Sequence, residues 1–364
     1  MVTISSADSG VSAEAMAGRV FNATLGAFET LSIYVGERLG WYRSLVTDGP
    51  ATAAELAART RTQQRYALEW LEMQAVLGIL VPQDSSGSGE RRFMLPPGAA
   101  EALTDEHSLS YLGALPRLVA SVGRLMPSLL DAYREGGGVS WGQQGDDARE
   151  AQAALNRPWF EQRLGLALES VPDLAGVLGA PGARMADIGC GAGWSTIALA
   201  RAYPHAQLVG VDIDEPTVAM ARANAVATGL TDRVTFQLAD AESLTDHGPF
   251  DAAFAFECLH DMPQPVEVLA AMRAAVRPGG LVVIMDEAVA PEFSAPGDEV
   301  EQIMYGYSLF ICLPDGLSST PSVGTGTVMR QPILQTYARQ AGYSQVEVLP
   351  ITDFSFFRFY RLHR

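Results

Sequence analysis

The sequence contains no lysine, so all 25 of its basic residues are arginine, and it holds only three cysteines. Cysteines this few and this scattered, at positions 190, 258 and 312, favour a reducing cytoplasm and argue against a disulfide framework or a zinc site. Long apolar runs are missing too. Prolines and arginines interrupt the apolar segment 108–130, and the first residues lack a basic-then-apolar pattern, so we expect neither a membrane span nor a signal sequence.

The composition is that of a folded globular chain. Of its 364 residues, 48% are hydrophobic and 18% are charged, which is enough apolar material for two domains with their own cores. Acidic residues outnumber basic ones, and the net charge of −17 repels polyphosphates. We therefore do not expect nucleic acid to be a general partner.

The most informative segment is Asp187-Ile188-Gly189-Cys190-Gly191-Ala192-Gly193, which follows an apolar run and precedes a helical pattern at 194–202. Glycines at this spacing let the backbone turn sharply and approach a ligand closely. A dinucleotide site would have its third glycine one residue later, and the carboxylate of Asp187 would repel a pyrophosphate. An acid beside this turn suits a cationic ligand instead.

Strand and helix patterns alternate after this turn. A strand at 207–212 ends in Asp212, where the ribose hydroxyls of a nucleoside would bind. Further strands are expected at 234–238, before Asp240-Ala241-Glu242, at 250–256 and at 281–285, and a helix at 265–276 that stops at Arg277-Pro278-Gly279-Gly280. The last two strands, 345–351 and 354–362, are joined by a turn at Thr352-Asp353 and should pair antiparallel. The alternation predicts an α/β fold with a doubly wound, mostly parallel sheet.

The order and spacing of these motifs over residues 184–290 resemble the class I S-adenosylmethionine-dependent methyltransferases. The resemblance implies a Rossmann-like sheet with a C-terminal antiparallel hairpin, S-adenosyl-L-methionine as methyl donor, S-adenosyl-L-homocysteine as product, and no metal. It also implies a set of cofactor-binding residues. These are Asp187, Gly189, Gly191 and Gly193 at the methionine end, Asp212 and Ile213 at the ribose, Asp240 and Ala241 at the adenine, and Glu257.

A general base is expected at His260, which follows the fourth strand at the ligand-binding edge of the sheet. Small-molecule O-methyltransferases have a His-Asp pair followed by tryptophan here, and that histidine is their base. This chain matches with His260-Asp261 but has Met262 in the third place. The alternative is that His260 caps the strand or contacts the cofactor without moving a proton.

Other acids complete the expected catalytic set. Asp261 and Glu287 are assigned to it with His260, and Glu287 could orient the histidine by accepting its second ring N–H. Glu257 and Asp286 are further candidates. Each of these carboxylates could equally be a helix cap or a solvated side chain.

The N-terminal part is predicted to be mainly helical. Helices are expected within 13–45, at 55–59 behind a Thr52–Glu55 capping box, and at 63–77, followed by short strands at 79–81 and 92–95 around a tip at 84–89. This order resembles a winged helix, which would read DNA or serve dimerisation. The arginines and glutamates of 51–81 balance, which disfavours DNA. Small-molecule O-methyltransferases carry a similar domain that dimerises and closes the acceptor pocket.

The sequence thus predicts three parts: a winged-helix-like dimerisation or lid domain at 1–105, a helical linker and substrate cap at 106–180, and the cofactor-binding domain at 181–364. A flexible loop is expected at 136–147. Nearby Trp141, Trp159 and Phe160 either cover substrate or form core. The resemblance implies that the segment 304–330 helps to form the acceptor pocket, and its aromatic, apolar residues suit a lipophilic small molecule. Its turn at 324–327 could instead cap the next helix through Thr327. Arg330 could pair with an acidic group of the substrate, although a surface salt bridge is favoured.

The expected function is methyl transfer to a small-molecule acceptor, most simply a hydroxyl, by a cytoplasmic homodimer. Nitrogen and carbon acceptors stay open, because the motif describes the donor only. Two alternatives remain: a winged-helix regulator that senses a ligand, and an enzyme that binds the same cofactor for a reaction other than methylation.

Overall fold

The structure, a computed structural model, describes residues 11–83 and 91–364. The chain divides into two compact units, Met1–Asp105 with Ser110–Ala120, and Glu106–Leu109 with Ser121–Arg364. The expected tip at 84–89 lies outside the described residues. Within the two described ranges, no helix is both long enough and apolar enough to cross a membrane.

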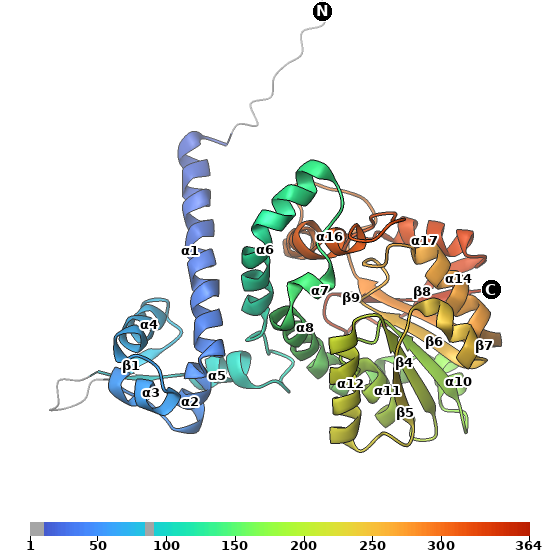
Figure 1. Cartoon of the computed structure of the whole chain (residues 1–364), viewed down its shortest axis with the longest axis horizontal. Helices are drawn as coiled ribbons and strands as arrows, with labels where there is room; N and C mark the ends of the chain where they lie inside the picture. Colours follow the sequence, from blue (N-terminus) through green and yellow to red (C-terminus); the bar gives the residue numbers. More distant parts are fainter. Residues whose placement is uncertain (1–10, 84–90) are drawn as a thin grey trace, which may run out of the picture. The chain divides into compact units, whose positions relative to one another are not determined.

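The second unit is built on a seven-stranded sheet in the order β5-β4-β3-β6-β7-β9-β8 (Figure 1). The strands are β3 (Arg184–Ile188), β4 (Gln207–Asp212), β5 (Val234–Leu238), β6 (Phe250–Phe256), β7 (Val276–Glu287), β8 (Gln345–Val348) and β9 (Phe357–His363). All pairs are parallel except those of β9, which runs antiparallel to both β7 and β8. The predicted α/β class, with its antiparallel end, is confirmed. The winding direction reverses between β3 and β6, and such a point is where ligands bind in this kind of sheet.

Helices cover both faces of this sheet, because side chains of buried strands point alternately to either side. In β6, Phe254 and Phe256 join one core, whereas Ala253 and Ala255 join the other. The helices of the first core include α9 (Gly165–Glu169), α10 (Pro172–Leu178), α11 (Trp194–Ala202) and α12 (Glu215–Thr228). Those of the second include α14 (Pro265–Ala275) and α17 (Gln331–Gln340).

Two strand boundaries differ from the prediction. The fifth strand, β7, begins at Val276 and runs through the expected stop at 277–280, because the β6–β7 register slips between the pairs Phe250–Val276 and Ala252–Leu281 and accommodates extra residues as a bulge. The last two strands are joined by residues 349–356 rather than by a tight turn. Leu349, Ile351 and Phe354 of this connection are buried in the core, so it packs against the sheet instead of reversing at once.

The region 121–180 is helical throughout much of its length. Its elements are the second part of α6 (Leu115–Glu135), then α7 (Trp141–Gln144), α8 (Asp146–Trp159) and the π-helical turn η1 (Phe160–Leu164). The loop expected at 136–147 is therefore confirmed only for residues 136–140, which form neither helix nor strand, because a Ser140–Gln143 capping box then starts α7. Trp159 and Phe160 pack with Phe354 and Phe256, so both belong to the core.

The first unit consists of α1 (Ala13–Arg38), α2 (Trp41–Thr47), α3 (Ala53–Thr60), α4 (Gln64–Val76), the antiparallel pair β1 (Val81–Gln83) and β2 (Arg92–Met94), and α5 (Pro97–Thr104). The Thr52–Glu55 capping box is present. The strand expected at 79–81 instead starts at Val81. Gly78 adopts φ +79°, and the N–H groups of Ile79 and Leu80 donate to the Gln74 carbonyl, so these residues close α4.

Candidate active site

The glycine-rich turn after β3 has a backbone that only glycine accommodates easily. Gly189, Gly191 and Gly193 have φ of +65°, +53° and +80°. A Cβ at Gly193 would lie 2.4 Å from the Phe236 ring, and one at Gly189 would lie 2.8 Å from the Cys258 sulfur. The turn is therefore packed directly against β5 and against the loop that follows β6.

Asp187 lies in β3 just before this turn and is buried. Its Oδ2 accepts hydrogen bonds from the hydroxyls of Ser195 and Thr196 at the start of α11, both at 2.6 Å, while its Oδ1 has no partner. Burial raises the pKa of Asp187 to about 6, and the two hydroxyls oppose that rise. A half-satisfied buried carboxylate of this kind fits a cationic ligand. The two hydroxyl residues were missed in the sequence, although they directly follow the glycine motif.

Asp212, at the end of β4, is hydrogen-bonded to the glycine-rich turn. Its Oδ2 accepts from the Gly191 N–H and its Oδ1 from the Asp214 N–H, both at 2.9 Å, and burial raises its pKa. Ile213 beside it is 75% exposed. Asp240 is exposed and caps the short helix η2 (Ala241–Ser243) by accepting from the Glu242 N–H. The predicted ribose and adenine residues thus follow neighbouring strands at the same edge of the sheet.

An ion pair that sequence reasoning missed supports this edge. Arg149 of α8 is buried and donates to both carboxylate oxygens of Asp214, at 2.6 and 2.9 Å. Asp214 in turn caps α12 through the Thr217 N–H. No spacing in the sequence links a helix at 146–159 to a strand end near 212, so the pair could not be predicted.

Glu257 follows β6 and adopts φ +54°, which is unusual for a residue with a side chain. Its N–H donates to the carbonyl of Met285 in β7, so the hydrogen bonding between β6 and β7 extends to Glu257 although the chain already turns there. Asn156 of α8 donates to its carboxylate. Burial raises the pKa of Glu257 to about 7, a shift that the Asn156 hydrogen bond opposes.

His260 lies on the same loop and is buried among acids. Its Nδ1 is 2.9 Å from Asp286 Oδ1, with which it forms a hydrogen bond, and 3.2 Å from Glu287 Oε2. Asp286 and Glu287 end β7, the strand next to β6, so both reach the histidine from the neighbouring strand end. Asp286 thus provides the orienting hydrogen bond that the sequence prediction assigned to Glu287, and Glu287 lies beside it.

The charges of this group are coupled. Burial acts to lower the pKa of His260, but the carboxylates of Asp261, Asp286 and Glu287 outweigh it and hold that pKa well above its usual value. Burial raises the pKa of Glu287 well above its usual range. The pKa of Asp286 is lowered, because the neighbouring His260 outweighs the effect of burial. The arrangement favours an imidazolium beside one charged and one neutral carboxyl group.

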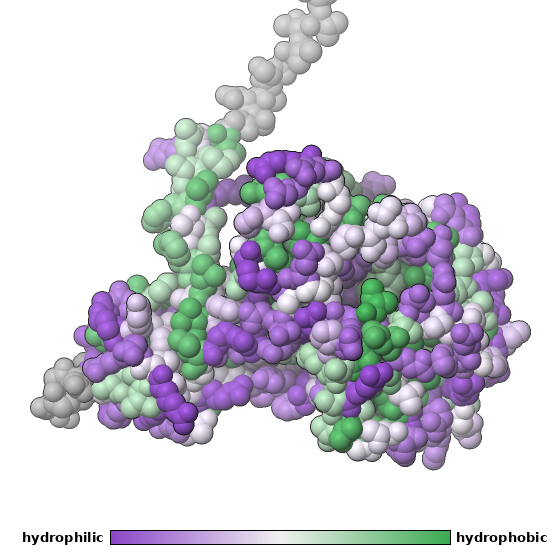
Figure 2. Space-filling view, viewed as in Figure 1, coloured by the Kyte–Doolittle hydropathy of each residue, from purple (hydrophilic) through white to green (hydrophobic). Residues whose placement is uncertain are grey.

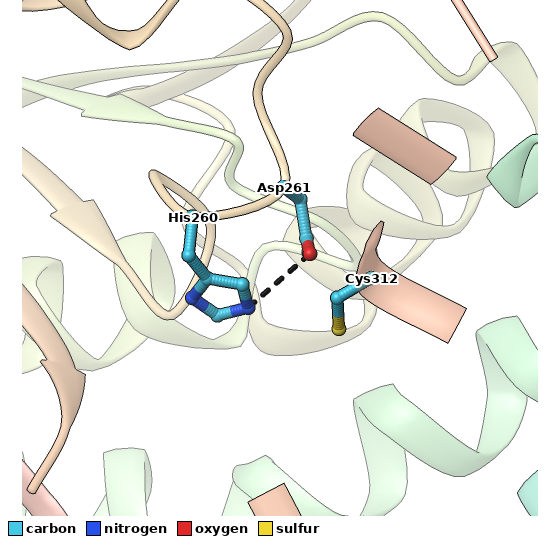
Figure 3. Close-up of side chains that lie close together, drawn as sticks. All are labelled: His260, Asp261 and Cys312. Atoms are coloured by element: carbon cyan, nitrogen blue, oxygen red, sulfur yellow. Dashed lines mark ion pairs between the residues drawn. The ribbon is translucent and has the colours of Figure 1, made fainter. Parts of the chain in front are cut away.

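The other ring nitrogen of His260 faces a different pair of groups (Figure 3). Asp261 Oδ1 lies 3.2 Å from Nε2, and the thiol of Cys312, in the π-helical turn η3 (Ser308–Cys312), lies near both. The helices α15 (Glu299–Tyr307) and α16 (Leu313–Gly316) flank η3. The Gly326 N–H donates to the His260 carbonyl at 3.1 Å, so part of the segment 304–330 contacts the His260 loop.

The expected cap at Thr327 is wrong, because α17 begins after Arg330 and has no side-chain cap. Arg330 instead forms an ion pair with the buried Glu301, at 2.9 and 3.0 Å. This pair joins α15 to the start of α17 and bounds the segment that connects them.

Comparisons of the sequence and of the fold with known proteins give matches over this part of the chain. Residues 185–280 match the family described as "Methyltransferase domain". A ubiquinone biosynthesis O-methyltransferase of Aromatoleum aromaticum is 30% identical over 197 residues, 54% of this chain and 72% of that protein. The 27-O-demethylrifamycin SV methyltransferase of Amycolatopsis mediterranei is 33% identical over 138 residues, 37% of this chain and 50% of that protein. The chain therefore spans only half the length of this second relative.

The fold extends over the whole chain. Human N-acetylserotonin methyltransferase, solved in complex with SAM, aligns with a TM-score of 0.68 at 20% identity, covering 98% of this chain and 99% of its own. The chain therefore belongs to the class I S-adenosylmethionine-dependent methyltransferases and is similar to the small-molecule O-methyltransferases.

We expect the Arg149→Met variant to lose about 3 kcal/mol of unfolding free energy, because it leaves Asp214 without its cation in a largely buried position. Arg134 offers a matched control, since its ion pair with Asp131 is exposed on both sides. Arg134→Met should cost less than about 1 kcal/mol. Urea denaturation of both variants measures the difference, and equal losses would contradict a supporting role for the Arg149 pair.

Proposed function

We propose that this protein transfers a methyl group from S-adenosylmethionine to a hydroxyl of a small-molecule acceptor, with His260 as general base. One observation carries the proposal: His260 follows the strand next to β3, is oriented through Nδ1 by Asp286, and presents Nε2 toward η3. A histidine held in this way is a general base fixed in one tautomer.

The residues after β3, β4 and β5 fit the donor. The unpartnered Oδ1 of buried Asp187 suits an ammonium group, and the close glycine turn leaves no room for a side chain beside it. Asp212 would hold the ribose, with Ile213 beside it, and Asp240 with Ala241 the adenine. When bound, the cofactor supplies a methyl group on a positively charged sulfur, which is a good leaving group.

The protein's own part is alignment, exclusion of water and removal of one proton. In the neutral state, His260 Nε2 accepts the proton of the acceptor hydroxyl as the oxygen becomes a nucleophile. The imidazolium that results is stabilised by Asp286 on Nδ1 and by Asp261 near Nε2. Glu287 adds to this stabilisation to the extent that it is ionised.

A small, largely apolar acceptor suits the segment that faces His260. Tyr307 precedes η3, and burial raises the pKa of its hydroxyl, so this phenol stays neutral. Met304 and Ile311 on the same helices are buried. The names of two relatives given above, an O-methyltransferase of ubiquinone biosynthesis and a 27-O-demethylrifamycin SV methyltransferase, also refer to methylation at oxygen.

A DNA-reading role for the first unit receives less support. Three arginines of α4 and the strand region are paired with acids: Arg65 with Glu69, Arg91 with Glu72, and Arg92 with Glu55. Pairing of this kind leaves little free positive charge for phosphates. We therefore prefer dimerisation and closure of the acceptor pocket as the role of the region 1–105, with 106–180 as linker and cap, in a cytoplasmic enzyme.

Dimerisation would explain the apolar surface of α1. The second half of this helix packs on α4, where the Trp70 indole N–H donates to the Ser32 carbonyl. The part of α1 before residue 29 carries large apolar side chains that are half exposed or more, among them Phe21, Leu25 and Phe28 at helical spacing. Figure 2 shows this stripe as hydrophobic colour along α1. We propose that a second copy of the chain covers it.

We expect His260→Gln to lower the rate of methyl transfer about 100-fold or more, because it removes the base. Calorimetric binding of S-adenosylhomocysteine should be unchanged, since the residue lies outside the donor-binding set. His205→Gln, in the loop before β4, is the matched control and should keep full turnover. Melting temperatures of both variants check their folding. Full turnover of folded His260→Gln would contradict the base assignment.

The pH dependence of methyl transfer should reflect the protonation of His260. Neighbouring carboxylates hold the pKa of His260 above its usual value, so the neutral base gains population as pH rises through that pKa. We expect kcat/KM to rise with pH above about 6.5. Asp286→Asn removes one of these carboxylates and should move the rising limb to lower pH by about one unit or more. An unmoved limb in pH–rate profiles would argue against this assignment.

Light scattering after size-exclusion chromatography tests the dimer. We expect the native chain at twice its monomer mass and the double variant Phe21→Ser/Phe28→Ser at monomer mass, because its apolar stripe is interrupted. Val226→Ser, an equally exposed apolar residue on α12, should stay dimeric. A monomeric native chain would remove this proposal without affecting the catalytic one.

A further inference from the structure

Three side chains of different chemistry converge at the Nε2 side of His260 (Figure 3). The donor atoms of His260, Asp261 and Cys312, a ring nitrogen, a carboxylate oxygen and a thiol sulfur, all lie within 4.8 Å of one another. Nε2 and Asp261 Oδ1 are 3.2 Å apart. Two of the residues come from the loop after β6, and the third from η3, about 50 residues further along the chain.

We propose that these three residues form a binding site for Zn²⁺. Zinc is bound by histidine nitrogen, thiolate sulfur and carboxylate oxygen at about 2.0–2.3 Å, so tetrahedral ligand atoms lie about 3.4–3.6 Å apart. In this cluster Nε2 and Asp261 Oδ1 are already at about that separation, at 3.2 Å, and no pair of ligand atoms is more than 4.8 Å apart. A thiolate among the ligands selects against Mg²⁺ and Ca²⁺, which require oxygen.

The surroundings of the cluster support a metal independently. Asp286 accepts the hydrogen bond of Nδ1, as carboxylates behind zinc-bound histidines do, and this leaves the Nε2 lone pair for the metal. Asp261 Oδ1 is a buried atom that forms an ion pair with Nε2 but no well-directed hydrogen bond, so it faces the same point as the ring nitrogen. A second group of ligand atoms, those of His260, Asp286 and Glu287, uses Nδ1 and contains no thiol. It therefore suits zinc less well, and Asp286 serves better as the outer partner.

Three protein ligands leave the fourth position of a tetrahedral ion open. Zinc at this place would occupy the Nε2 lone pair that the proposed base needs. The metal therefore stops methyl transfer and is an inhibitor rather than a cofactor. This consequence rests on the proposed function, whereas the binding site itself does not. Binding displaces protons from the thiol and the imidazolium, so affinity should rise with pH.

Cobalt titration of the full chain, kept reduced by a phosphine, tests the site without any activity measurement. We expect one Co²⁺ per chain with the near-ultraviolet absorption of a thiolate-to-cobalt transition, and displacement of that absorption by one equivalent of Zn²⁺. Cys312→Ser should abolish the band and weaken Zn²⁺ binding, measured by calorimetry, about 100-fold. Cys258→Ser is the matched control and should keep both, since its sulfur donates to the Ile188 carbonyl instead. Melting temperatures check that each variant is folded.

The outcomes separate the two proposals. A band that survives in Cys312→Ser, or that is lost equally in Cys258→Ser, would overturn the site. No band in the native chain would do the same. Stoichiometric binding with unchanged methyl transfer in the presence of Zn²⁺ would overturn the inhibitory role. If His260→Gln kept its turnover while the native chain showed the cobalt band, the base assignment would fail and the metal site would stand.

Discussion

The site depends on one electrostatic constraint. Several carboxylates are held out of water at the carboxyl edge of the sheet, and the negative charge of each must be balanced by hydrogen-bond donors or cations close to it. Asp187 has two hydroxyl donors for one of its oxygens, and Asp286 has the His260 ring. Compensation is incomplete, because Asp187 Oδ1, Asp286 Oδ2 and Glu287 Oε2 have no hydrogen-bond partner. Buried acids left in this state cost stability and favour cations, which links the free energy of folding to the kind of ligand the site accepts.

The sheet makes this concentration of acids possible. Parallel strands β3, β4, β5, β6 and β7 end at one edge, and their winding reverses between β3 and β6, so Asp187 and the His260 loop lie on adjacent strands. A Cβ added at Gly189 would lie only 2.8 Å from the Cys258 sulfur, which shows how closely the two loops approach. The proposed donor-binding loop and the proposed base are thus brought to adjacent strand ends by topology rather than by any single motif.

This edge was predictable because its signals are local. The glycine turn, the acids at strand ends and His260 each occupy a fixed place relative to an apolar run, so the sequence predicted the sheet and most of the candidate residues. Arg149, Asn156 and Cys312 were not predictable, since each reaches the site from a helix or turn remote in sequence and their role appears only with tertiary packing. The predictions of a stop at 277–280 and of a loop through 147 were wrong for a related reason. Strand packing in β7 and the capping box of α7 outweighed the local tendency of glycine and proline to end or interrupt an element.

The two halves of the edge are also coupled by charge. Asp187 and His260 both act on the pKa of Cys258, which lies between their loops, and they act in opposite directions. In the mechanism proposed above, a cation bound beside Asp187 would repel the proton on His260, because like charges at one edge of the sheet disfavour each other. A positively charged donor bound there would lower the pKa of His260 and so increase the neutral fraction of the proposed base. Beside a product without the sulfonium charge, His260 would hold the accepted proton more strongly, so the return of that proton to water would be a separate and later step.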